Sequence, residues 1–325
     1  MLQRYILVWL LVTSGTAYFW PLLGISFDPF LANGGPAVHW LIIVTMTAVG
    51  ALLTTDEVDD VFRRWPTVLF GTCVQYTCMP LLAWLAVTIL KPNPETAAGI
   101  IIVGCVPGAM ASNVLTLTAR GNVSYSVSLT TMATMLSPLV VPAAMWLTMS
   151  GRIQYDASAT IRLMLLQIVL PVTCGHLFSR FLPAVRRLSA QYASVVANTS
   201  ILSIIAIAVA LKRPELALAG PALLTVLALI NLGGYCAGYF SGRLLRLPEP
   251  MRRALTLEVG MQNAGAGVAL ADRLFGDHSA AIIPCILYTS GCMLTGTILA
   301  TYWHHRRIGE PVEETPLSGR GDSAT

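Results

Sequence analysis

The sequence is poor in charged residues, which make up only 11% of its 325 positions. Soluble domains carry roughly 25% charged residues and about 45–50% apolar ones, whereas apolar residues make up 55% of this chain. This imbalance excludes an ordinary soluble domain and indicates an integral membrane protein. The net charge of +4 is too small to indicate a nucleic-acid-binding protein.

The sequence also lacks the residue spacings of metal centres, disulfide frameworks and catalytic motifs. Its seven cysteines lie in apolar stretches without a C-x-x-C pair, so we interpret them as small buried hydrophobic residues. No nucleophile elbow, phosphate-binding loop or pair of membrane aspartates occurs. We therefore do not expect an enzyme.

Apolar runs separated by short polar breaks dominate the chain, and a membrane-spanning helix needs about 20 such residues. The pattern predicts an all-α integral membrane protein with ten transmembrane helices in one domain over residues 1–302, followed by a disordered cytoplasmic tail over residues 303–325. The predicted spans are 4–24, 37–54, 66–90, 96–119, 122–149, 158–182, 189–211, 219–245, 251–274 and 279–302.

Basic residues in the short loops predict the orientation of these spans in the membrane. If the N-terminus is cytoplasmic, 14 of the 20 Lys and Arg residues fall in inner segments, as the positive-inside rule requires. We therefore expect a multi-pass protein of the cell (inner) membrane with both termini in the cytoplasm. The first apolar run has no small-residue cleavage site, so we interpret it as a retained span.

One predicted span, residues 251–274, contains a carboxylate at its centre. Glu258 is followed by the amide pair Gln262–Asn263, and three glycines interrupt the same stretch. A charge at mid-membrane costs about 3 kcal/mol, so either a cation compensates it or Glu258 is neutral and hydrogen-bonded to a neighbour. A helix broken at this depth frees carbonyl groups and helix ends for an ion or a substrate.

A second interruption lies five spans earlier, at Pro107–Gly108 in the span over residues 96–119. Proline removes a backbone donor and clashes with the preceding turn. Because five is an odd number, the second half of the chain would be inverted relative to the first. We expect two inverted five-helix repeats, residues 1–150 and 151–302, and such paired interruptions indicate a transporter site.

Neutral oxygen groups accompany the two interruptions. Ser126 and Thr130 are four residues apart on one helix face, and with Ser112, Asn113 and Glu258 they offer the oxygen ligands that hard cations prefer. The alternative is plain hydrogen bonding between helices. Gln75, an amide in an apolar run, requires a partner, which is either another amide such as that of Gln262 or a cation.

These motifs also carry a resemblance to a known family. The segments that carry it are Gly104-Cys-Val-Pro-Gly-Ala-Met-Ala-Ser-Asn, Ala119-Arg-Gly-Asn-Val, Ser128-Leu-Thr-Thr and Glu258-Val-Gly-Met-Gln-Asn. Over residues 35–300 the chain resembles the bile acid:sodium symporter family, in its bacterial type. The resemblance implies a panel of spans 1, 2, 6 and 7, and a core in which broken helices 4 and 9 cross in front of two sodium ions.

The resemblance further implies ligands at individual positions. The first sodium site would use Ser112, Asn113, Ser126, Thr130 and Glu258, and the second would use Gln75, Glu258, Gln262 and the backbone oxygens of Val259 and Met261. Substrate would meet Met110, Asn113, Asn263 and Cys292 beside the crossing. The family often has a glycine where this chain has Ala109.

The function that we expect is sodium-coupled symport of an organic anion by alternating access. The anion would be a bile acid or other steroid, or a small carboxylate such as a 2-oxo acid or pantothenate. The alternative is a membrane receptor or sensor whose sodium site is structural. A channel is disfavoured because Glu258 is single and implies no ring of charge. Beyond sodium, the substrate and the lipid bilayer, we expect neither nucleic acid nor an obligate protein partner.

Overall fold

The computed structural model describes residues 6–32, 34–149, 155–276 and 279–306. Over these residues the chain is helical and forms no named strand. The last helix runs to His305, three residues past the predicted end of the final span. Most of the predicted tail, residues 307–325, lies outside the described residues.

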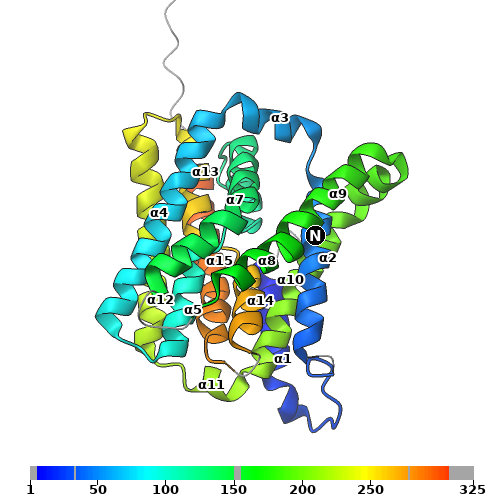
Figure 1. Cartoon of the computed structure of the whole chain (residues 1–325), viewed down its shortest axis with the longest axis vertical. Helices are drawn as coiled ribbons and strands as arrows, with labels where there is room; N and C mark the ends of the chain where they lie inside the picture. The colour runs from blue at the N-terminus through cyan, green and yellow to red at the C-terminus, as the bar shows by residue number, and fades with distance from the viewer. Residues whose placement is uncertain (1–5, 33, 150–154, 277–278, 307–325) are drawn as a thin grey trace, which may run out of the picture.

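The helices follow one another with short connections (Figure 1). They are α1 (Ile6–Phe19), η2 (Trp20–Leu23), α2 (Gly34–Leu52), α3 (Thr55–Arg63), α4 (Trp65–Leu90), α5 (Pro94–Cys105), α6 (Ala111–Thr118), α7 (Val123–Met149), α8 (Ala157–Met164), η3 (Leu165–Val169), α9 (Leu170–Phe181), α10 (Pro183–Leu211), α11 (Arg213–Ala217), α12 (Pro221–Leu244), α13 (Glu249–Gly260), α14 (Ala264–Phe275) and α15 (Ile282–His305).

The length and hydropathy of these helices establish a multi-pass membrane protein. Within the described ranges, seven helical segments are long and apolar enough to cross a membrane. They are Ile6–Leu23, Trp65–Leu90, Val123–Met149, Ala157–Phe181, Pro183–Leu211, Pro221–Leu244 and Ile282–His305. Two shorter apolar helices, Pro36–Leu52 and Pro94–Cys105, accompany them.

Two apolar stretches are interrupted at mid-length, at the residues where the sequence suggested a break. α5 ends because Val106, the residue before Pro107, is extended, as residues before proline usually are. α13 ends at Gly260, and Met261 is extended. A helix of 12 residues such as α5 or α13 is about 18 Å long, which is too short for a hydrocarbon core of about 30 Å. Each therefore reaches only part of the way, and α6 and α14 continue beyond the breaks.

The helices pack in two groups. α1, α2, α9 and α10 pack on one another, and glycines let α2 and α9 approach closely. A Cβ atom added at Gly50 would lie 1.9 Å from the Val172 carbonyl oxygen, and one added at Gly175 would lie 2.1 Å from that of Thr47. Such small-residue contacts are typical of helix packing in membranes.

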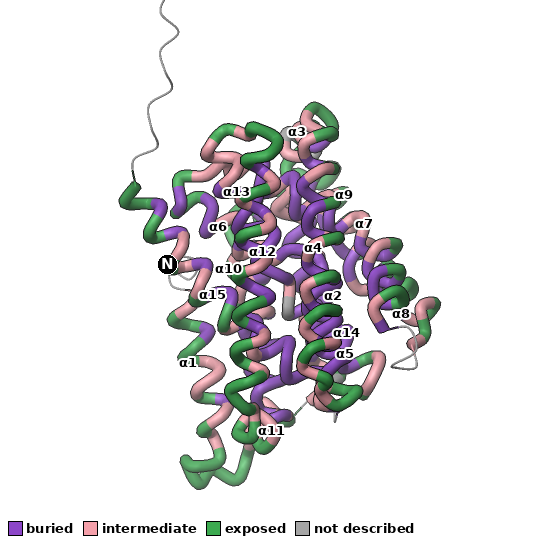
Figure 2. Tube along the Cα trace, turned by 90° about the vertical axis from the view of Figure 1, so that its left-hand side faces the viewer, coloured by how far each residue is buried: buried purple, intermediate pink, exposed green. Residues whose placement is uncertain are grey.

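The second group contains α4 to α7 and α12 to α15, with the interrupted helices inside it. Every residue of α5 from Ala97 to Cys105 and of α13 from Arg253 to Gly260 is buried, and Figure 2 shows buried chain through the middle of the molecule. The short helices α3 and α11 join the two groups at opposite ends of the molecule (Figure 1). The breaks thus lie deep in the protein, away from both connecting ends.

Candidate functional site

The two breaks pair with each other through their backbones. The Ala109 amide donates to the Met261 carbonyl at 2.8 Å, and the Asn263 amide donates to the Pro107 carbonyl at 2.8 Å. Gly108 and Gln262 form an isolated antiparallel bridge between these bonds. Backbone groups that the interruptions remove from helical hydrogen bonds are satisfied in this way, as a membrane interior requires.

Glu258 lies at this junction and is only 1% exposed. Ser112 of α6 donates its hydroxyl to Oε2 at 2.5 Å, and Thr130 of α7 donates to Oε1 at 2.7 Å. Among the ion pairs of the described residues, none includes Glu258. A buried carboxylate without a basic side chain beside it requires either a proton or a bound cation.

The structure brings together the oxygen atoms of the first predicted ligand set. Thr130 Oγ1 lies 3.4 Å from Asn113 Oδ1 and 3.1 Å from the Ser126 carbonyl oxygen. The buried Ser126 hydroxyl accepts from Thr116 Oγ1 at 3.3 Å. Three elements, α6, α7 and α13, supply these groups. The arrangement offers a carboxylate together with neutral hydroxyl and amide oxygens.

The structure also brings together the side chains of the second predicted set. The amides of Gln75 on α4 and Gln262 lie 3.2 Å apart, so the amide partner that Gln75 requires is present. A Cβ atom added at Gly108 would lie 2.1 Å from Glu258 Oε1 and 3.3 Å from Gln75 Nε2. Side chains of both predicted ligand sets therefore contact the backbone at Gly108.

The end of α13 leaves several carbonyl groups without their usual helical partners, and that of Val259 is one of them. The Met261 amide still bonds to the Leu257 carbonyl at 3.0 Å. The amide that would bond to Val259, four residues on, belongs to Asn263 and is taken by Pro107. Val259 is fully buried, so its carbonyl oxygen is suited to an ion. The Met261 oxygen already accepts the Ala109 amide and retains one lone pair.

All of these donors are oxygen atoms, which suits a hard cation such as Na⁺. Over the described part of the chain, no group of three or more His, Cys, Asp or Glu side chains is placed to hold a metal ion. One carboxylate among neutral oxygens would offset a single positive charge fully and two charges in part. The residues present therefore fit small monovalent cations.

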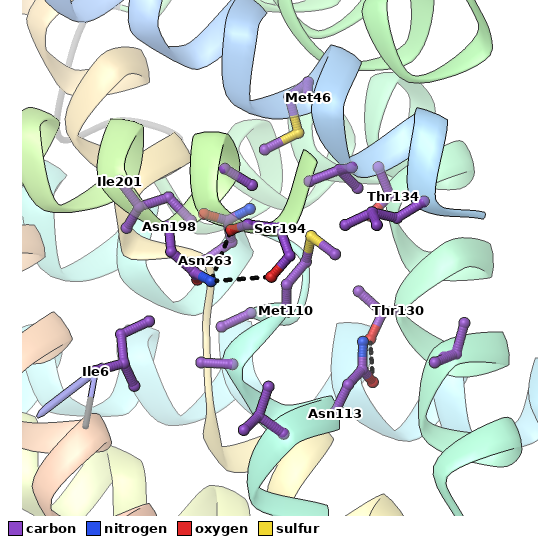
Figure 3. Close-up of a pocket in the computed structure, with 18 of the residues that line it drawn as sticks. Ile6, Met46, Met110, Asn113, Thr130, Thr134, Ser194, Asn198, Ile201 and Asn263 are labelled. Atoms are coloured by element: carbon purple, nitrogen blue, oxygen red, sulfur yellow. Dashed lines mark hydrogen bonds between the residues drawn. The ribbon is translucent and has the colours of Figure 1, made fainter. Parts of the chain in front are cut away.

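A cavity of about 240 Å³ opens beside the breaks (Figure 3). The predicted substrate residues Met110, Asn113, Asn263 and Cys292 all line it. Asn263 also caps α14, because its Oδ1 accepts the Ala266 amide at 3.1 Å, which leaves its nitrogen to donate to a ligand. Among the described lining residues only Glu57 carries a charge.

Sequence reasoning missed the polar groups on the opposite wall of the cavity. Asn198 and Ser194 of α10 both line it, and Asn198 Nδ2 donates to the Ser194 carbonyl at 2.8 Å (Figure 3). An amide within an apolar run was the signal used for Gln75, and the same signal marks Asn198.

The residues around the cavity differ between the α3 end and the α11 end of the molecule. Leu53 and Glu57 line the cavity next to α3. Toward the α11 end, His39 Nε2 of α2 lies 3.1 Å from Asp272 Oδ2 of α14 and joins the two helix groups. This contact gives His39 an acidic partner from the other half of the chain.

Comparison with known proteins identifies the family of the chain. Residues 39–218 match the model of the sodium bile acid symporter family. The chain is 32% identical over 285 residues to YocS of Bacillus subtilis, named an uncharacterized sodium-dependent transporter, covering 87% of each chain. It is 29% identical to the probable chloroplast sodium/metabolite cotransporter BASS1 of Arabidopsis thaliana, over 82% of this chain and 67% of that protein. It is 26% identical to human sodium/bile acid cotransporter 4, over 71% and 54%.

Proposed function

The chain belongs to the sodium bile acid symporter family, and from this premise we propose that it is a sodium-coupled symporter of an organic anion. Two sodium ions bind at the sets of oxygen ligands around Glu258. The anion binds in the adjacent cavity, and the protein exposes these sites alternately to the two sides of the membrane.

The main support for this proposal is that some residues of the proposed ion sites also line the cavity. Asn113, Thr130 and Gln262 belong to the proposed ion sites and also line the cavity. A cation that orders these side chains therefore orders part of the substrate site, and a bound anion stabilises the same arrangement. This shared wall gives a physical basis for a coupling free energy between ion and substrate.

The helix ends at the breaks support a negatively charged substrate. α6 begins at Ala111 and α14 at Ala264, and the N-terminus of a helix attracts negative charge. No Lys or Arg is among the described residues that line the cavity. The anion is therefore held by helix dipoles and by the amides of Asn113 and Asn263, with Met110 limiting its size.

The transport cycle that we propose uses ten spans in two inverted repeats of five. α1, α2, α9 and α10 form the panel, and the remaining spans form the core with its crossed broken helices. The connectors α3 and α11 at opposite ends of the molecule support an inverted relationship. With the α3 end in the cytoplasm, the cavity beside Leu53 and Glu57 corresponds to an inward-open state.

Uptake by purified protein in liposomes tests the proposal. A screen of carboxylates and steroid anions by thermal stabilisation, with sodium or choline, first selects a transported probe, since a bound ligand raises stability. We expect its uptake to require sodium, with a Hill coefficient above one because two ions bind. Equal uptake in sodium and choline would overturn the proposal, and sodium-dependent binding without uptake would support a receptor instead.

A further inference from the structure

A polar network on α12 and α15 reaches the end of α13 at the Gly260 carbonyl. Asn231 of α12 donates Nδ2 to this oxygen at 2.8 Å, and Tyr288 of α15 donates its hydroxyl to the same oxygen at 2.8 Å. A carbonyl oxygen has two lone pairs, so this one is fully used. Both side chains are at most 2% exposed, and neither belongs to the ligand sets described above.

Hydrogen bonds among Asn231, Thr295 and Tyr235 fix the orientation of the Asn231 side chain. Thr295 donates its hydroxyl to Asn231 Oδ1 at 2.7 Å, which requires the amide nitrogen to face Gly260. The Tyr235 hydroxyl lies 3.2 Å from Thr295 Oγ1 and donates to the Cys292 carbonyl at 3.3 Å. A Cβ atom added at Gly260 would lie 2.1 Å from the Tyr235 ring, so the ring packs directly against the break.

Asn231 differs from Asn198 in where its amide finds a partner. Asn198 bonds to the Ser194 carbonyl of its own helix, one turn earlier. The same local solution exists in principle for any asparagine in a helix. Asn231 instead reaches a different helix and the carbonyl at which α13 ends. Its partner is the carbonyl group next to that of Val259, whose helical partner, the Asn263 amide, bonds to Pro107 instead.

We propose that Asn231 and Tyr288 are positioning residues for the second sodium site, because they fix the Gly260 carbonyl and thereby hold the neighbouring Val259 carbonyl toward the ion. The inference rests on the proposed function and adds residues to it that do not touch the ion. Gly260 has no side chain to restrict its backbone. Without both donors its peptide groups are free to turn, and the Val259 oxygen loses its fixed direction.

The test is a sodium titration of the melting temperature of the purified protein, with choline keeping the ionic strength constant. The variants are Tyr288→Phe, which removes one donor and keeps the ring, and Asn231→Leu, which removes the amide. Tyr125→Phe is the matched control, because the buried Tyr125 hydroxyl also donates to a backbone carbonyl, that of Thr67, at 3.0 Å.

We expect Tyr288→Phe to raise the sodium concentration for half-maximal stabilisation about three- to tenfold, the equivalent of one hydrogen bond. Asn231→Leu should raise it further, and Tyr125→Phe should leave it unchanged. If the variants reach the same sodium-induced rise in melting temperature as the wild-type protein at higher sodium concentrations, they are folded and only their sodium affinity is reduced. A purely structural role lowers the melting temperature equally in sodium and choline, and that result in both variants would overturn the inference.

The same titration distinguishes this inference from the proposed function. If the wild-type protein is stabilised by sodium and the Tyr288→Phe protein responds identically, the positioning role is wrong and sodium binding stands. If sodium does not stabilise the wild-type protein more than choline does, the ion sites themselves are wrong, and the positioning role is refuted with them.

Discussion

Replacement of Glu258 by Gln isolates the charge at the junction of the two breaks. The substitution keeps the size of the side chain and one of its oxygens. The Ser112 and Thr130 hydroxyls, which now donate to Oε2 and Oε1, can rotate so that one of them accepts from the new amide. The fold should therefore persist, and the main loss should be the attraction between the carboxylate and a cation.

The size of this loss can be worked out from the contact distance. A unit charge pair at about 2.4 Å in an effective dielectric of about 20 interacts by on the order of 7 kcal/mol before desolvation is subtracted. If about a fifth of this attraction survives desolvation, about 1.4 kcal/mol is lost, and sodium binding weakens about tenfold. Because Glu258 faces both ligand sets, we expect both sites to weaken.

Calorimetric titration of purified Glu258→Gln protein with sodium measures this loss. The alternative of a neutral, structural Glu258 predicts nearly unchanged binding, since a glutamine resembles a protonated carboxyl group. Affinity equal to that of the wild-type protein at both sites would refute the ion-site assignment. The melting temperature in choline serves as the control for folding.

The remaining predictions concern the backbone and the cavity. Gly108→Ala should abolish the stabilisation by sodium, because the new Cβ would lie 2.1 Å from Glu258 Oε1 and displace the carboxylate; a normal sodium titration would contradict this. Met110→Ala or Met110→Thr should widen the cavity and change the order of preferred substrates in competition uptake while sodium affinity stays within about twofold, a change of less than about 0.5 kcal/mol. A large change in sodium affinity with unaltered preference would show that Met110 does not border the substrate.

The features predicted best from the sequence are those that follow from local chemistry. Pro107 and Gly108 together disfavour a helix, and a carboxylate at position 258 is costly in an apolar span unless a partner compensates it. These two facts located both interruptions. The ligand residues around them then followed from the spacing of Ser126 and Thr130 and from the family motifs, and the structure brings those side chains together.

Contacts between distant segments were not predictable from local patterns. Asn231, Tyr288 and the His39–Asp272 pair acquire their roles only from helices far away in the chain. The helix α3 is a different case, because a recognisable signal was overlooked. Thr54 and Glu57 form a capping box there, and the Thr-x-x-Glu pattern that encodes it is visible in the sequence.

The reciprocal hydrogen bonds between the two breaks can form only after both halves of the chain have been synthesised. Gly108 and Gln262 are bridged, yet about 150 residues separate them, which corresponds to roughly 8–30 s of synthesis at about 5–20 residues per second. During that interval the Pro107 carbonyl and the Ala109 amide have no partner from the second half. A ribosome-bound first half therefore depends on water or on the insertion machinery for those hydrogen bonds, and the proposed ion sites can form only after α13 has been synthesised.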